Sequence, residues 1–158
     1  MKIDEIDVKI LEILQEKGRI TNAALASEIG LSPAPTLERV RKLENGGFIK
    51  SFHALIDAHK LGLHVIVYIE VKLNYHTRFT IEKFIEQISG INEVVEAYHT
   101  TGEGDFLLKL YSPSIEQYQQ FVVSKLSKLE GVGHIRSNVV LSTVKKEMSL
   151  PLDYLSRV

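Results

Sequence analysis

The sequence contains no cysteine. This excludes disulfide bonds, zinc–thiolate sites and a thiol nucleophile, and it fits a reducing compartment. The chain also lacks an apolar run long enough to cross a membrane, and no basic segment followed by an apolar leader opens it. We therefore expect a cytoplasmic protein that has no membrane partner.

A large net charge is missing too, since the chain of 158 residues carries a formal charge of −1 at pH 7. This argues against binding nucleic acid over the whole surface, but a DNA-binding protein needs only a local basic face. Arg39, Arg41, Lys42 and Lys50 provide such a cluster, with Glu44 as the one opposing charge within it. A hydrophobic content of 44% is typical of a globular protein, and the length allows one ordinary domain or two small ones.

The N-terminal part predicts three helices. Apolar residues at helical spacing predict the first over residues 3–17, with Asp4 as its N-cap, and a shorter one follows between Thr21 and Gly30. The third is expected from Pro33 to about Asn45, after an N-cap at Ser32; its prolines lie in the first turn, where no intrahelical hydrogen bond is lost. Its inward-facing residues are expected to be Leu37, Val40 and Leu43. A glycine turn between the last two helices predicts a helix-turn-helix.

The rest of the chain predicts a sheet with helices. Residues 48–56 are expected to form a short strand or wing, and residues 51–64 the wing strand and linker between a domain over 1–50 and a domain over 65–158. In the second domain, strands are predicted over 65–73, 94–101, 106–111 and 135–141, with helices at about 81–90 and 114–129. This order is the ferredoxin-like βαββαβ arrangement, so the fold class is α+β. Helices cover only one face of such a sheet, so we expect a homodimer that covers the other.

Three segments of the chain together resemble the leucine-responsive/asparagine-synthase-regulator (Lrp/AsnC) family, also called feast/famine regulators. They are DEIDVKILEILQEKGRIT, EIGLSPAPTLERVRKLENGGFI and TTGEGDFLLKL. The resemblance implies an N-terminal winged helix-turn-helix that binds double-stranded DNA and a C-terminal ferredoxin-like (RAM, ACT-like) domain that senses an amino acid. It also implies dimers through the sheet domain, often assembled into octamers. The predicted function is a DNA-binding transcriptional regulator that responds to an amino acid or a related small-molecule effector and has no cofactor.

The predicted DNA-binding residues lie on the third helix, because the second helix of a helix-turn-helix enters the major groove with its N-terminal residues nearest the bases. Long cations suit phosphate or guanine contacts, whereas Glu38 would repel phosphate and is expected to face a base edge or to pair with a neighbouring cation. Arg39 also matches a family position where arginine is usual. The set is Ser32, Ala34, Pro35, Thr36, Glu38, Arg39, Arg41 and Lys42.

The predicted effector site is the turn between the second and third strands. Two glycines there are most simply a hairpin turn with positive φ. Unpaired N–H groups of the turn could also bind an amino-acid carboxylate, and Asp105 could accept from its ammonium group. The resemblance implies this role and adds a hydroxyl residue on the last strand; relatives often carry an aromatic residue in place of Gly104. The set is Thr100, Thr101, Gly102, Glu103, Gly104, Asp105 and Ser137.

Two other functions stay open at the level of the sequence. Ferredoxin-like sheets host enzymes, but the chain shows no Ser/His/Asp order, P-loop or dinucleotide fingerprint. A sensing protein that has lost DNA binding is the second alternative. The six histidines lack metal-ligand spacing, so no metal site is predicted, although His99 could line the effector site.

Overall fold

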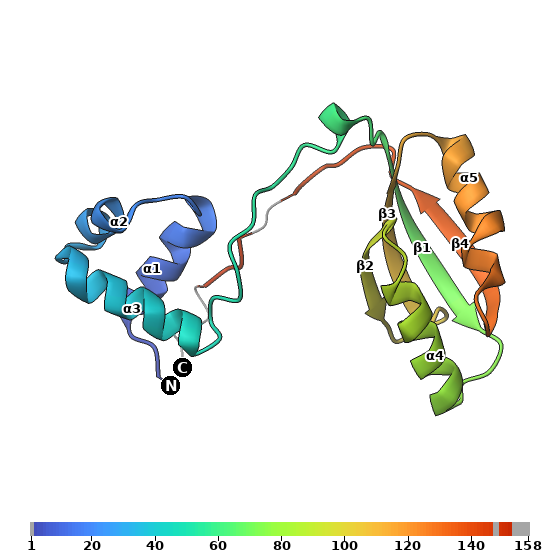
Figure 1. The fold of residues 1–158 in the computed structure, drawn as a ribbon, viewed down its shortest axis with the longest axis horizontal. Helices are drawn as coiled ribbons and strands as arrows, with labels where there is room; N and C mark the ends of the chain where they lie inside the picture. The colour runs from blue at the N-terminus through green and yellow to red at the C-terminus, as the bar shows by residue number, and fades with distance from the viewer. Residues whose placement is uncertain (1, 147–148, 153–158) are drawn as a thin grey trace. The chain divides into compact units, whose positions relative to one another are not determined.

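The computed structural model describes residues 2–146 and 149–152, and the chain divides into two compact units. The first comprises the chain up to Leu55 together with the segment after Val144, and the second runs from Ile56 to Val144 (Figure 1). The division expected from the sequence, with domains over 1–50 and 65–158 and a wing strand and linker over 51–64, stays a prediction. Among the described helices, none is long and apolar enough to cross a membrane.

Three helices form the first unit: α1 (Glu5–Glu16), α2 (Asn22–Ile29) and α3 (Pro33–Asn45). Asp4 caps α1, and Thr21 caps α2 by accepting from the N–H of Ala24. Gly30 ends α2 with a φ of 73°, which favours glycine. The buried apolar residues described in this unit are Ile10, Leu25, Ala26, Ile29 and Leu43. The predicted helix-turn-helix is confirmed.

Residues 48–56, all of which the structure describes, form no strand, so of the two expectations for this segment, a short strand or a wing, the strand is wrong. A strand requires a ladder of hydrogen bonds to a neighbouring strand. Here the N–H groups of Phe48 and Ile49 instead donate to the carbonyl of Leu43, at 2.9 and 3.3 Å, and close the end of α3. Ile49 packs against the helices, whereas Phe48, Phe52, Leu55 and Ile56 are exposed.

The second unit contains a four-stranded antiparallel sheet in the order β2-β3-β1-β4. Its elements, in chain order, are a 3₁₀ turn (His59–Leu61), β1 (Val65–Leu73), α4 (Arg78–Ser89), β2 (Val94–His99), β3 (Phe106–Ser112), α5 (Ile115–Ser124), a second 3₁₀ turn (Leu126–Lys128) and β4 (Val132–Val139). The α+β, ferredoxin-like expectation is confirmed. The fifth helix is shorter than expected because its last residues form the second 3₁₀ turn.

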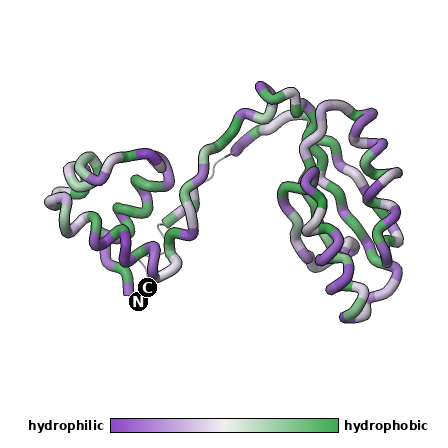
Figure 2. Tube along the Cα trace, in the orientation of Figure 1, coloured by the Kyte–Doolittle hydropathy of each residue, from purple (hydrophilic) through white to green (hydrophobic). Residues whose placement is uncertain are grey.

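Both helices pack on one face of the sheet. Alternate residues of β1, from Val67 to Leu73, are buried together with Phe84 of α4 and Phe121 of α5. Figure 2 shows hydrophobic stretches along the strands and hydrophilic residues recurring on the helices. The intervening β1 residues, such as Tyr68 and Glu70, lie on the uncovered face.

Candidate functional site

The start of α3 presents most of the predicted DNA-binding residues to solvent. Ser32, Ala34, Pro35, Glu38, Arg41 and Lys42 are all exposed. Ser32 is the N-cap residue, but its side chain makes no capping hydrogen bond, which leaves its hydroxyl available. The side-chain amide of Asn22 donates to the carbonyl of Pro33 at 2.7 Å and ties the start of α2 to the start of α3.

Thr36 corrects the prediction, because it was expected to be exposed and is completely buried. Its hydroxyl donates to the carbonyl of Ser32 at 2.9 Å, so the side chain turns back into the helix start and the core. Leu37, which was expected to face inward, is instead 38% exposed. A helix whose buried stripe advances by three and four residues alternately explains both errors, since Thr36, Val40 and Leu43 share one face.

Two of the cations on α3 already have partners within the chain. Glu38 accepts from Arg41 at 3.2 Å, which confirms the expected pairing with a neighbouring cation; both side chains are mostly exposed. Arg39 donates to Asp4 and Asp7 of the α1 region. The sequence showed a basic helix but not that one of its arginines faces another helix.

A cavity of about 370 Å³ lies on the uncovered face of the sheet. It is lined by residues of β1, β4 and the loop between β2 and β3: Glu70, Lys72, Glu103, Gly104, His134 and Arg136. Arg136 is 3.6 Å from a carboxylate oxygen of Glu70 and 3.8 Å from one of Glu103. The lining therefore combines positive and negative groups within one small volume.

Only Glu103 and Gly104 of the predicted effector residues line this cavity. Gly102 has a φ of 124°, as expected for the turn, whereas Gly104 does not have a positive φ. A Cβ on Gly104 would lie 3.4 Å from the Cβ of Glu70, so a side chain there would enter the cavity wall. Thr100 and Thr101 are exposed.

Asp105 and Ser137 are engaged elsewhere. One carboxylate oxygen of Asp105 accepts from the N–H of Leu73 at 2.7 Å and the other lies 2.8 Å from Nε2 of His76. Ser137 pairs across the sheet with the buried Ile69, and its hydroxyl accepts from Tyr118 of α5. Ser137 thus faces the helices, on the opposite side of the sheet from the cavity. His99 stacks on the buried Phe106, with ring centroids 4.8 Å apart.

The missed cavity residues lie on two strands that are distant in sequence. Glu70 and Lys72 alternate with the buried residues of β1, so the sequence indicates that they point away from the helices. They lie beside Arg136 and His134 of β4 only because the register pairs Glu70 with Arg136 and Lys72 with His134. No motif in the sequence specifies that register. Among residues 2–146 and 149–152, no group of three or more histidines and acids is placed to hold a metal ion.

Comparison with known proteins assigns both halves of the chain. Residues 66–150 match the family model described as the Lrp/AsnC ligand binding domain, and residues 3–50 match one described as a winged helix-turn-helix that binds DNA. The chain belongs to the Lrp/AsnC family. It is a DNA-binding transcriptional regulator, as the other members are, and the resemblance seen in the sequence is confirmed.

Individual Lrp/AsnC relatives match along nearly the whole chain. The leucine-responsive regulatory protein of Klebsiella pneumoniae is 38% identical over 148 residues, which are 94% of this chain and 90% of that protein. The transcriptional regulator AzlB of Bacillus subtilis is 36% identical over 151 residues, 96% of each. A transcriptional regulator from Neisseria meningitidis, crystallised in complex with L-Met, is 33% identical with a TM-score of 0.93, covering 97% of this chain and 99% of that one.

Proposed function

We propose that this regulator contacts DNA through the exposed start of α3 and binds an amino acid in the cavity on the uncovered face of its sheet. The observation that carries the proposal is the cavity, which is lined by both positively and negatively charged side chains. It lies in a chain of the Lrp/AsnC family. Support also comes from the Neisseria meningitidis relative, which was crystallised with L-Met.

The exposed residues of α3 have the chemistry needed at a DNA groove. Ala34 and Pro35 can contact thymine methyl groups, while Ser32 can donate to phosphate. Arg41 and Lys42 lie more than one turn further toward the C-terminal end of α3 and can bind phosphates. Because both side chains of the Arg41–Glu38 pair are exposed, Arg41 can exchange Glu38 for a phosphate at little cost in free energy.

The charges of the cavity are complementary to those of a free amino acid. A zwitterion presents an ammonium group to Glu70 or Glu103 and a carboxylate to Arg136 or Lys72. The absence of a side chain at Gly104 leaves space beside Glu70 for the amino acid's own side chain. The proposed effector residues are therefore those that line the cavity, with Glu103 and Gly104 retained from the sequence prediction.

A mobility-shift experiment tests the two halves separately. The full chain is titrated onto duplex DNA from its own upstream region at several salt concentrations, and then with each free amino acid added. We expect salt-sensitive retardation that at least one amino acid changes. Arg136→Gln is expected to abolish the response to the amino acid while the affinity without it is kept.

The matched control is Lys83→Gln, a substitution on α4 outside the cavity that also removes one positive charge. Retardation by the wild-type chain that no amino acid changes contradicts the effector proposal alone. Absence of any salt-sensitive retardation contradicts the DNA contact by α3.

We also propose that the chain forms a homodimer through the uncovered face of the sheet, and that such dimers can assemble into octamers. Half-buried apolar side chains of the two central strands support this, since they lie on the face that carries no helix: Ile66, Tyr68, Leu107 and Tyr111. A dimer would present two copies of α3 to a roughly palindromic DNA site.

A further inference from the structure

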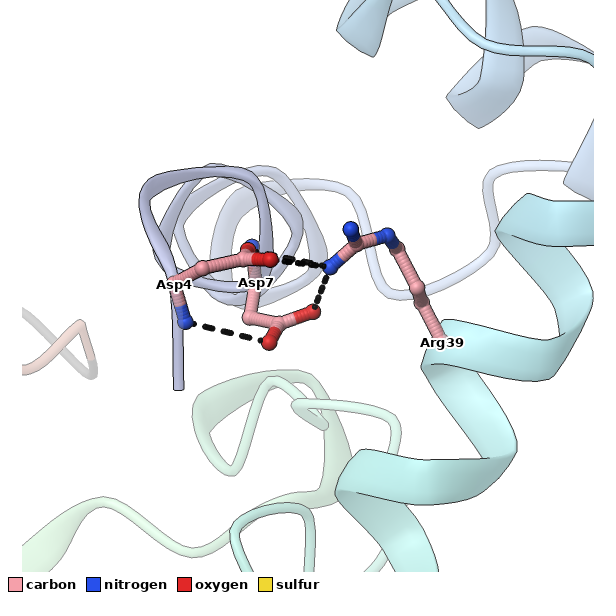
Figure 3. A network of polar contacts seen from close by, with 3 residues as sticks. All are labelled: Asp4, Asp7 and Arg39. Carbon is pink, nitrogen blue, oxygen red and sulfur yellow. Dashed lines mark hydrogen bonds and ion pairs between the residues drawn. The ribbon is translucent and has the colours of Figure 1, made fainter. Parts of the chain in front are cut away.

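Arg39 directs its guanidinium toward α1. Its Nη1 donates to both carboxylate oxygens of Asp4, at 2.9 and 2.8 Å, and to Oδ1 of Asp7 at 2.7 Å (Figure 3). The Asp7 side chain is only 2% exposed and that of Arg39 is 28% exposed. Arg39 therefore connects α3 to a buried carboxylate on another helix.

The two carboxylates are themselves fixed by the start of α1. The N–H of Asp7 donates to Asp4 at 2.9 Å, and the N–H of Asp4 donates to Asp7 at 3.2 Å, which together form a capping box. The hydrogen bond from Asp7, followed by that from Arg39, lowers the pKa of Asp4 and keeps it charged. Arg39 thus binds a pair of acceptors that the backbone has already placed.

We propose that Arg39 is a positioning residue, which fixes α3 on α1 in the orientation that presents the DNA-binding face, and that it does not itself contact DNA. This rests on the proposed contact between α3 and DNA. A guanidinium that moved to a phosphate would leave the carboxylate of Asp7 buried and without its cation, which is strongly unfavourable. Arg39 is therefore removed from the phosphate-binding set predicted from the sequence.

Arg41 provides the contrast on the same helix. Its side chain is 60% exposed and its partner Glu38 is 72% exposed, so neither depends on the other to avoid a buried charge. The same residue type thus serves two roles within one turn of α3: Arg41 faces the DNA side and Arg39 faces the helix that supports it.

The salt dependence of DNA affinity separates the two roles. Each phosphate contact contributes about 0.9 to the slope of log affinity against log salt. We expect Arg41→Gln, the matched control, to reduce the slope by about 0.9. Arg39→Gln is expected to lower affinity about tenfold or more at every salt concentration with no change of slope. A slope reduced by about 0.9 in Arg39→Gln would overturn the proposal.

Asp7→Asn gives a second test in which the two roles predict opposite signs. If Arg39 contacted phosphate, removing a competing carboxylate would raise DNA affinity. As a positioning pair, Asp7→Asn lowers affinity as Arg39→Gln does, and the double variant is no weaker than either single one. Higher affinity in Asp7→Asn, or additive losses in the double variant, would overturn the proposal.

Circular dichroism establishes first that each variant is folded. If Asp7→Asn does not fold, Asp4→Asn replaces it, since that side chain is 54% exposed; it is expected to lower affinity, and a rise in affinity counts against the proposal. The wild-type titration keeps the two ideas apart. Loss of salt-sensitive binding in the wild type contradicts the DNA contact by α3, whereas a wrong slope or sign in the variants contradicts only the role of Arg39.

Discussion

The side chain of Thr36, which the sequence predicted to face DNA, is completely buried and lies on the inward face of α3. Its hydroxyl donates to the carbonyl of Ser32, and its own N–H donates to the same carbonyl at 3.3 Å. The residue therefore secures the first turn of the helix that Pro33 begins. This local role is independent of any base or phosphate.

Thr36→Val keeps the volume of this side chain and removes the hydroxyl. We expect the free energy of unfolding to fall by about 1 kcal/mol, the usual contribution of one such hydrogen bond. DNA affinity per folded molecule should stay within about twofold, because a buried group makes no DNA contact. Urea unfolding and a DNA titration measure the two quantities. Unchanged stability with a large loss of affinity would show that the hydroxyl faces DNA after all.

Asp4 makes the stability of the first unit depend on pH in the acid range. Because its folded pKa lies below the ordinary value of 3.8, its stabilising contribution is present above that value and is lost as pH falls through the folded pKa. We expect Asp4→Asn to be less stable than the wild type at neutral pH and to lose less stability on acidification. Unfolding curves between neutral pH and the acid range check this. Glu12→Gln, which removes the same charge from an exposed position elsewhere on α1, is the matched control for stability at neutral pH.

At the scale of elements, the caps and turns were predictable because their signals are local. Asp4, Thr21 and Gly30 act where the sequence placed them, since each satisfies backbone groups within four residues. The wing strand was not predictable in the same way. Its formation depends on a partner strand, and apolar residues such as Phe48 and Ile49 fit packing against a helix equally well.

Besides the contact of Arg39 with Asp4 and Asp7, the first unit contains a contact between α1 and the C-terminal segment. The side-chain amide of Gln15 donates to the carbonyl of Leu150 at 3.3 Å, and its oxygen accepts from the N–H of Leu150 at 2.6 Å. Leu150 and Leu152 also line a groove with Leu11, Leu14 and Phe52. The side chain of Gln15 thus bonds both backbone groups of Leu150, as a neighbouring strand would, and connects the C-terminal segment to α1.

Gln15→Ala should release this segment while α1 stays helical, because alanine is a good helix former. We expect faster hydrogen exchange at the N–H of Leu150 and faster proteolysis of the segment after Val144. Gln15→Glu is the matched variant: it keeps an acceptor for the N–H but loses the donor, so its effect should be intermediate. Equal exchange rates in all three proteins would show that the contact does not hold the segment.

At the scale of the whole molecule, the sequence was sufficient to recognise the helix-turn-helix, the sheet region and the family. It was not sufficient to predict the cavity, because the cavity residues are brought together by the register of the sheet. Alternation along β1 indicated which residues face outward, but Arg136 becomes a neighbour of Glu70 only through pairing of β1 with β4. The same register turns Ser137 toward Tyr118 and away from the cavity. Shifting the pairing by one residue would reverse both outcomes, so the site required the three-dimensional structure.

The uncovered sheet face leads to the last prediction, which concerns assembly. Leu107, on β3, pairs across the sheet with Glu70 and Tyr98 and lies half-buried on that face. If a second copy covers it, Leu107→Glu places a second carboxylate beside Glu70 in a desolvated interface and should convert dimers into monomers. Sedimentation measures the mass, and the weaker binding of monomers to a palindromic site should appear in the same protein.

Val123→Glu is the control for this change, because Val123 is 69% exposed on α5 and lies on the helical side of the sheet. It introduces the same charge and should leave the mass unchanged. A monomeric wild type would contradict the dimer directly. Retention of the wild-type mass by a folded Leu107→Glu variant would instead place the interface on another surface, and then the paired arrangement of the two α3 helices would need a different contact to support it.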